Sequence, residues 1–332
     1  MECMQEGPLV GITSTIPSEV VYAAGMCPVD LNNAFITAPD PDRLLSEAEN
    51  AGFPRTVCAW IKGIYGAVVE LGLQRLIAVT GGDCSNAIAL ADVLEHRGVH
   101  VDRFDYPPDR GRAGLERAVN RLTEALGARR SKVGEAKQRL DRIRTKLQRL
   151  DRMTYQENRV NGLENHLFLV SSSDFNSDPD QYEAELDAFL AEAGRRVPQN
   201  PSVRLGYVGV PPIFSDLYET LERLGARVVF NEVQRQFSLP GPDRDLLDCY
   251  LDYTYPYDIG GRIKDIQRAV RERRLHGIIH YTQTFCHRQI HDILIREAVE
   301  IPVLTLEGDR PGGLDGRTLT RVETFLEMLK GL

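Results

Sequence analysis

The sequence predicts an α/β protein in which two domains, each with a short parallel sheet, flank a long amphipathic helical segment. Short apolar runs with strand character alternate with segments of helical periodicity in both halves of the 332-residue chain. Between the halves, apolar residues recur every three, four or seven positions among charged side chains. Alternating strands and helices favour parallel strands with right-handed crossovers, so each domain is expected to be Rossmann-like or flavodoxin-like.

Composition and charge narrow the functional classes. The chain has 40 Lys and Arg against 48 Asp and Glu, a formal net charge of -8, and its basic residues are scattered among acidic ones. Such a pattern offers no basic face for nucleic acid. No apolar run approaches the roughly 18 residues of a membrane span, and the acidic N-terminal segment differs from a signal peptide. We therefore expect a cytoplasmic protein that binds neither nucleic acid nor membrane.

Domain boundaries follow from changes of pattern along the chain. A first α/β domain is expected over residues 1–110, a helical connection over residues 111–165 and a second α/β domain over residues 166–332. Each α/β domain is long enough to bury its own core. The connection is expected to be a helix pair or hairpin with a break near Gly127, and its apolar stripe exceeds what one short sheet can cover.

The first half contains short apolar runs bounded by turn residues. Pro17 and Gly25 fit the start and the C-cap of a first helix, and Pro54 lies just before another. Strands are expected over residues 8–13, 27–31, 76–79 and 99–107, and helices over residues 18–24, 57–71 and 85–97.

The stretch LIAVTGGDCSNAIA, residues 76–89, places a cysteine at a strand-to-helix junction. Its apolar run has the continuous hydrophobicity of a strand buried on both faces, and two glycines allow a tight loop before the helix. Cys84 is therefore expected at the carboxyl edge of a sheet, beside backbone N–H groups that lower the pKa of a thiol. The alternative is a small buried side chain at a crowded turn.

The second half repeats this alternation. The segment HGIIHYTQTFCHRQIHDIL has the same order of buried strand, polar loop, cysteine and helix, which gives Cys286 a placement like that of Cys84. Neither a GxGxxG nor a GxxxxGK[ST] motif occurs, so no dinucleotide or P-loop site is supported. Strands are expected over residues 203–210, 226–233, 277–283 and 301–309, a loop and helix over 211–224, and helices over 246–253, 262–273, 285–297 and 317–329.

The six cysteines contain no CxxC pair, which argues against a disulfide scaffold in a chain of this length and favours a reducing compartment. Ligands gather at the carboxyl edges of parallel strands, so Cys84 and Cys286 are expected to meet across a cleft between the domains, where Cys58 joins them from a helix start. Three thiolates suit an iron-sulfur cluster or zinc and leave one metal position open. Spacing does not choose between these metals, and three independent buried cysteines are the alternative.

Five segments in order carry a family resemblance: GITSTIPSEVVYAAGMCPVDL, CAWIKGIYG, TGGDCSNAIALADVL, TFCHRQIHDIL and IPVLTLEGDRPGGLDGRTLTRVETFLEML. Together they resemble the 2-hydroxyacyl-CoA dehydratase D-component family, which includes benzoyl-CoA reductase subunits and double-cubane cluster proteins, over nearly the whole chain. The resemblance implies that Cys58, Cys84 and Cys286 are the three protein ligands of a 4Fe-4S cluster whose fourth iron has a non-cysteine ligand. The other three cysteines do not fall on these positions.

The resemblance also implies a reaction and partners. In dehydratases of this type two homologous subunits pair, and a separate ATP-hydrolysing iron-sulfur activator supplies one electron at low potential. The acyl-CoA substrate would bind the open iron through its thioester carbonyl, form a ketyl radical and lose its hydroxyl group. A cluster with an open site can act as Lewis acid and electron donor together. We therefore expect a 4Fe-4S component of a 2-hydroxyacyl-CoA dehydratase-type lyase.

Other functions stay open on the sequence. They are a double-cubane cluster reductase of small molecules, a non-catalytic partner or electron-transfer subunit, and a scaffold whose cysteines are only core residues. The apolar stripe of the helical connection favours a pseudo-symmetric dimer, formed with a homologous subunit or with a second copy of the chain. The alternative is a connection that folds back on its own sheets.

Two side chains near the first strand are candidates for catalysis. Ser14, with Thr15 beside it, is expected to reach the cleft, where a hydroxyl could hydrogen-bond an iron-bound hydroxide or a substrate oxygen. Capping of the next helix is the alternative for these hydroxyls. Glu19, in the first turn of that helix, is a candidate acid catalyst or a residue that complements the helix dipole.

Two further features are a histidine pair and a glycine-rich loop. His287 and His291 lie four residues apart on one expected helix, which is a metal-pair spacing, but no HExxH-type glutamate accompanies them. His287 could instead tune the cluster. Asp309, in the glycine-rich loop EGDRPGGLDGR, is expected to cap a helix, form a salt bridge or join the domains.

Overall fold

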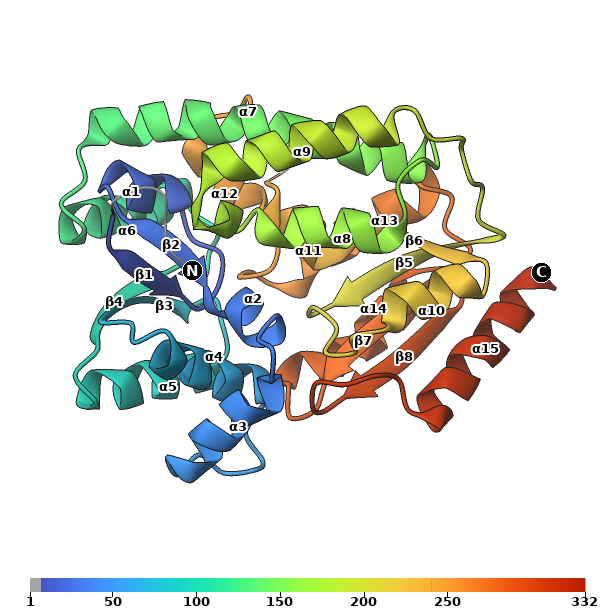
Figure 1. Ribbon diagram of the computed structural model, residues 1–332, viewed down its shortest axis with the longest axis horizontal. Helices are drawn as coiled ribbons and strands as arrows, with labels where there is room; N and C mark the ends of the chain where they lie inside the picture. The colour runs from blue at the N-terminus through green and yellow to red at the C-terminus, as the bar shows by residue number, and fades with distance from the viewer. Residues whose placement is uncertain (1–6, 240, 332) are drawn as a thin grey trace.

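A computed structural model describes residues 7–239 and 241–331. The strands are β1 (Leu9–Ile12), β2 (Cys27–Asp30), β3 (Arg75–Gly81), β4 (His100–Asp105), β5 (Val203–Gly209), β6 (Ala226–Asn231), β7 (Gly277–Gln283) and β8 (Val303–Gly308). Within the described residues they form two four-stranded parallel sheets of order β2-β1-β3-β4 and β6-β5-β7-β8, which lie beside each other in Figure 1. The two sheets share one topology, and the predicted α/β class with two Rossmann-like or flavodoxin-like halves is confirmed.

The first sheet is packed against closely fitting helices. Residues 76–79 of β3 are at most 1% exposed, which explains their uninterrupted hydrophobicity. In the central helix, Gly63 faces the ring of Phe35, and a Cβ there would lie 2.3 Å from a ring carbon. This close approach fixes the helix that begins just after Cys58. The helices of this half are α1 (Ser18–Ala23), α2 (Leu31–Ile36), α3 (Pro41–Asn50), α4 (Ala59–Glu70), α5 (Ser85–His96) and α6 (Arg112–Ala125).

The second sheet has its own helices: α10 (Leu217–Arg223), α11 (Glu232–Phe237), α13 (Ile259–Glu272), the 3-10 turn η2 (His287–His291), α14 (Asp292–Ala298) and α15 (Gly316–Lys330). Two sequence predictions are corrected here. The expected strand over residues 226–233 ends at Asn231 because α11 starts at Glu232. The expected helix over residues 285–297 is divided at Asp292, whose carboxylate is held by His280 at 2.7 Å and Thr305 at 2.6 Å.

A helical layer lies across both halves, with α7 (Arg130–Tyr155) and α9 (Pro179–Ala193) running along the top of Figure 1. The short elements α8 (Gly162–Ser171) and η1 (Phe175–Ser177) connect them. The predicted break near Gly127 is confirmed, since this residue has φ +67° between α6 and α7. The prediction of leftover apolar surface is not met, because the α7 stripe is buried against α8, α9 and neighbouring residues of the same chain. Its fully buried members are Leu140, Ile143, Leu147 and Leu150.

A segment of the second half crosses back to the first. The helix α12 (Leu246–Asp252) contributes Tyr250 to the hydrophobic core of the first sheet, and its hydroxyl donates to the Ile16 carbonyl oxygen at 2.9 Å. Tyr253 and Tyr257 join the same core. The two halves are therefore tied together by shared packing near the ends of β1 and β3. Among the described residues, no helix is both long and apolar enough to cross a membrane.

Candidate functional site

The carboxyl ends of β1, β3, β5 and β7 open onto one cavity of about 220 Å³. It is lined by Ser14 after β1, Cys84 after β3, Val210 after β5 and Cys286 after β7. In each sheet these central strands are neighbours from which the chain winds in opposite directions, and such switch points are the usual ligand sites of open parallel sheets. The shared topology therefore places two potential ligand sites face to face.

Cys58, Cys84 and Cys286 all line this cavity, as the sequence predicts. Each cysteine directly precedes a helical element, namely α4, α5 and η2. Backbone N–H groups in the following turns donate to the three sulfur atoms. These donors come from Trp60 and Ile61 for Cys58, from Asn86 and Ala87 for Cys84, and from Arg288 for Cys286.

The pKa values of the thiols differ from the sequence prediction. Burial, with smaller contributions from Cys286 and Cys84, raises the pKa of the Cys58 thiol to about 12. Burial also raises the pKa of Cys84 and that of Cys286. The expectation of lowered thiol pKa values is therefore wrong, because lost hydration outweighs the N–H donors. A metal cation that binds such thiols displaces their protons.

The three thiols are donors of the kind that hold iron-sulfur clusters. Over residues 7–239 and 241–331, no three His, Cys, Asp or Glu side chains are grouped so that they could hold one ion. The protein ligands of a 4Fe-4S cluster bind different irons and stand further apart than the ligands of one ion. Three thiols from separate elements line one largely apolar cavity, and thiolates are the usual protein ligands of such clusters.

Ser14 lies at the cavity and Glu19 does not. The neighbouring Thr15 hydroxyl is buried and has no hydrogen-bond partner among the described residues. The Glu19 carboxylate is fully buried, where it accepts hydrogen bonds from Arg144 at 2.6 Å and from the Tyr250 hydroxyl at 3.0 Å. The structure thus places Glu19 in a polar contact between α1, α7 and α12, away from the residues that line the cavity.

The two histidines after Cys286 do not converge. His287 lines the cavity, whereas the Nδ1 atom of His291 lies 3.2 Å from Nη1 of Arg262 behind it. A histidine pair that shares one metal ion is therefore not formed, although His287 remains close to the cysteine that precedes it.

The glycine-rich loop after β8 contacts both the cavity wall and the first half. The Asp309 carbonyl oxygen accepts a hydrogen bond of 2.8 Å from Gln283, which lines the cavity. The contact between the halves is made by the next residue, since Arg310 pairs with Asp42 at 3.0 Å and with Glu49 at 3.4 Å. The joining residue of this loop is therefore Arg310, one position beyond the sequence candidate.

Arg288 is a cavity residue that the sequence analysis did not identify. Its guanidinium donates to the Tyr255 carbonyl oxygen at 2.9 Å and lies over the Tyr255 ring at 4.1 Å. A longer contact of 3.5 Å reaches the carbonyl oxygen of Gly82, in the loop that carries Cys84. Arg288 therefore bridges the two halves beside the thiols. Its position next to Cys286 was visible in the sequence, but its partner Tyr255 was not.

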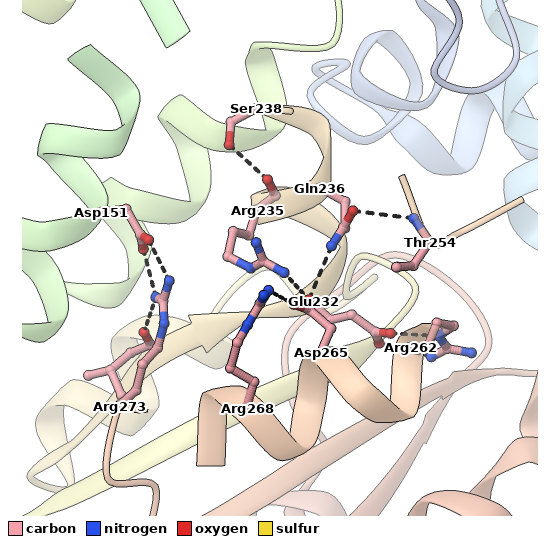
Figure 2. Close-up of polar contacts among 11 residues, drawn as sticks. Asp151, Glu232, Arg235, Gln236, Ser238, Thr254, Arg262, Asp265, Arg268 and Arg273 are labelled. Carbon is pink, nitrogen blue, oxygen red and sulfur yellow. Dashed lines mark hydrogen bonds and ion pairs between the residues drawn. The ribbon is translucent and has the colours of Figure 1, made fainter. Parts of the chain in front are cut away.

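A buried ion pair between Arg262 and Glu232 joins α13 to α11 (Figure 2). Arg262 donates to the Glu232 carboxylate at 2.5 and 2.9 Å, and Glu232 also accepts the N–H of Gly209, the last residue of β5, at 2.9 Å. The positive charge of Arg262 lowers the pKa of the Cys286 thiol, although burial still raises it overall. This pair therefore fixes the end of β5 and favours the thiolate of Cys286.

Helices from three layers complete the cavity. Apolar side chains that line it include Trp60 and Ile64 of α4, Val170 of α8 and Phe237 of α11. The cavity is also lined by one polar side chain of α8, His166, which was not a sequence candidate. The sequence pattern does not distinguish His166, because its contact partner, Tyr218, lies far away in the chain. The site is thus a small apolar chamber with polar groups at selected points.

Comparison with known proteins gives one result. The model of a family described as 2-hydroxyglutaryl-CoA dehydratase, D-component, matches residues 13–329, which is nearly the whole chain. No curated protein matches the sequence.

Proposed function

Because the chain belongs to the 2-hydroxyglutaryl-CoA dehydratase D-component family, we propose that it is the iron-sulfur component of an enzyme that reductively dehydrates a 2-hydroxyacyl-CoA. The observation that supports this most strongly is the convergence of Cys58, Cys84 and Cys286 from three separate elements on one cavity. A scaffold protein would not need its cysteines at the switch points of both sheets.

In this proposal the three cysteines hold a 4Fe-4S cluster that has one iron without a cysteine ligand. When bound, such a cluster supplies a Lewis acid and a one-electron donor at the same place. The N–H groups at the helix starts and the charge of Arg262 stabilise the thiolates once their protons have left. These protein groups thereby offset part of the cost of burying three thiolates.

The remaining cavity residues act on the substrate. Ser14 lines the chamber, and its hydroxyl is proposed to hydrogen-bond an oxygen of the acyl group. The apolar wall, which includes Trp60 and Phe237, limits the access of water to a reduced substrate. Glu19 is bonded to Arg144 and Tyr250, so we assign it a role in stability and not in proton transfer.

We further propose two protein partners. An ATP-hydrolysing iron-sulfur activator supplies the electron, and a homologous chain, either a sister subunit or a second copy, covers the segment beside Cys286. That segment exposes four large apolar side chains, Phe285, Ile290, Ile293 and Leu294, at 40–65% of their surface. Apolar groups exposed this close together in one short segment are typical of an interaction surface.

Anaerobic purification tests the metal assignment. We expect brown protein with about four iron atoms per chain. The single variants Cys58→Ser, Cys84→Ser and Cys286→Ser should each lose most of this iron. Cys249→Ser is the matched control, because Cys249 is buried in α12 outside the cavity and donates to the Gly241 carbonyl oxygen.

Three outcomes would change the assignment. Colourless protein after anaerobic reconstitution would contradict the cluster. About eight iron atoms per chain would favour a double-cubane reductase. Protein with the full cluster that forms no enoyl-CoA from 2-hydroxyglutaryl-CoA or 2-hydroxybutyryl-CoA, in the presence of an activator and ATP, would favour a non-catalytic electron-transfer subunit.

A further inference from the structure

His166 lines the cavity from α8. Its ring stacks on the ring of Tyr218 in α10, with centroids 4.6 Å apart and an angle of 23° between the planes. Its Nδ1 atom lies 3.3 Å from the Tyr218 hydroxyl oxygen. Its Nε2 atom has no hydrogen-bond partner among the residues that the structure describes. One ring nitrogen is therefore engaged and the other is left for a ligand in the cavity.

The hydrogen bonds of Tyr218 influence which ring nitrogen of His166 carries the proton. The side-chain amide of Asn231, at the end of β6, donates to the Tyr218 hydroxyl oxygen. With this direction of the Asn231 amide, the hydroxyl proton can point at His166, and Nδ1 can then accept a hydrogen bond. A neutral imidazole that accepts at Nδ1 carries its proton on Nε2. The chain of contacts from Asn231 through Tyr218 thus presents an N–H donor to the cavity.

The imidazole is held neutral by its surroundings. Burial lowers the pKa of His166 to about 4, and no carboxylate of the described residues contributes to counteract this. Tyr218 and Asn231 are themselves 4% and 3% exposed, so water does not compete for the contacts between them. Burial therefore favours the neutral imidazole at neutral pH.

We infer that His166 donates its Nε2–H to the thioester carbonyl oxygen of the acyl-CoA substrate, and that Tyr218 and Asn231 are positioning residues for this donor. The inference rests on the proposed function and adds a substrate-binding residue to it. A carbonyl oxygen only accepts hydrogen bonds, which matches a ring nitrogen that only donates. A donor held in this largely apolar cavity also stabilises the negative charge that develops on this oxygen when the acyl group is reduced.

The tautomer is tested directly by long-range 1H–15N correlation spectra of the oxidised, reconstituted protein labelled with 15N-histidine. We expect the His166 signals, assigned by their loss in His166→Gln, to show a protonated Nε2 and an unprotonated Nδ1. Tyr218→Phe should abolish the fixed tautomer. The control Tyr182→Phe removes a buried hydroxyl that bonds the Phe168 carbonyl oxygen instead and should leave the His166 signals unchanged. A proton on Nδ1 in the wild-type protein would overturn the inference, whatever the variants do.

The acceptor is tested by calorimetric titration with 2-hydroxybutyryl-CoA and with the thioether S-(2-hydroxybutyl)-CoA, which lacks the carbonyl oxygen. His166→Phe should weaken binding of the thioester about five- to tenfold, as expected for one neutral hydrogen bond. It should not change binding of the thioether, and His166→Gln, which retains an N–H donor, should restore part of the thioester affinity.

The outcomes separate this inference from the proposed function. Equal losses for both compounds, or no loss for either, would overturn the role of His166 and leave the proposed function intact. Failure of the wild-type protein to bind either compound would contradict both the acyl-CoA substrate and the acceptor assigned here.

Discussion

Glu19 and Arg144 form a buried ion pair of 2.6 Å between α1 and α7, two helices that are more than one hundred residues apart in the chain. Neither side chain is more than 3% exposed, and the Tyr250 hydroxyl of α12 bonds the same carboxylate at 3.0 Å. Three elements from different parts of the chain are therefore joined at one carboxylate. This arrangement explains why Glu19 is needed in the fold without contact to the cavity.

The first prediction concerns this pair. Glu19→Ala leaves the Arg144 charge buried without a partner and should lower the free energy of unfolding by about 3–5 kcal/mol, as measured by urea denaturation. The double variant Glu19→Leu, Arg144→Met should recover most of the loss. Glu183→Ala, which breaks the more exposed pair with Lys146, should change stability little. Full stability of Glu19→Ala together with lost turnover would instead support a catalytic role.

The sequence allowed the strands and the cysteine positions to be predicted because these depend on local pattern. The uninterrupted apolar run before Cys84 requires a strand buried on both faces, and the two glycines require a turn. The contacts of Glu19, His166 and Arg288 could not be predicted because their partners lie far away in the sequence, at Arg144, Tyr218 and Tyr255. Such roles follow from tertiary contacts, which have no periodic signal.

Side-chain burial also decided the thiol pKa values. The helix starts near Cys58 and Cys84 could be located from the sequence, and the N–H donors are present as expected. The extent of desolvation could not be predicted, because it depends on how α4 and α5 pack around the shared cavity. The N–H donors therefore lower the thiol pKa values as predicted, but burial raises them by more.

The second prediction concerns pH. Burial, and then the nearby Asp30 carboxylate, raises the pKa of Asp174 to about 7. In the unfolded chain its pKa is near 3.8, so between about pH 4 and pH 7 only the folded state holds this proton. The free energy of unfolding should decrease as pH rises through this window, by at most about 1.4 kcal/mol per pH unit.

The matched variants isolate this effect. In Asp174→Asn the decrease with pH should be flatter than in the wild-type protein, when both are followed by denaturation between pH 5 and pH 8. Asp180→Asn, which changes an exposed carboxylate on α9, should keep the wild-type slope. Parallel curves for the wild-type protein and Asp174→Asn would rule out a raised pKa at Asp174.

The third prediction concerns the attachment of the helical layer to the second sheet. Arg273 donates to both carboxylate oxygens of Asp151 in α7, as drawn in Figure 2. It also donates to the Val229 carbonyl oxygen in β6. Arg273→Met should destabilise the protein by about 3–5 kcal/mol because it leaves a largely buried carboxylate unpaired. Hydrogen exchange should accelerate near the C-terminal end of α7. Arg149→Met, which breaks an exposed pair with Glu157, is the control. Unchanged exchange in Arg273→Met would show that this contact does not hold the layer in place.

The fourth prediction concerns assembly. The apolar stripe of α7 is buried within the chain, so the exposed side chains of η2 and α14 are the better candidates for an interface. Ile290→Asp and Ile293→Asp should shift sedimentation of the anaerobically prepared protein toward the monomer. Met328→Asp, at an exposed position on α15, should not. A wild-type protein that is monomeric both alone and with a homologous subunit, yet retains its cluster and turns over, would contradict the proposed partner.

The last prediction concerns the metal-free protein. With a pKa near 12, about one Cys58 side chain in ten thousand would be a thiolate at pH 8, and Cys58 is also the most buried of the three cavity cysteines. After anaerobic removal of the metal, iodoacetamide should modify Cys58 at least tenfold more slowly than Cys84 and Cys286, as followed by mass spectrometry of peptides.

Each bound thiol must lose a proton, so cluster reconstitution should become faster as pH is raised from 7 to 9. The loaded protein should be protected at all three positions, because sulfur bound to iron is no longer available as a nucleophile. Rapid modification of Cys58 in the loaded protein would mean that it is not a ligand, whereas rapid modification confined to the metal-free protein would mean that its thiol is less desolvated than its position at the start of α4 requires.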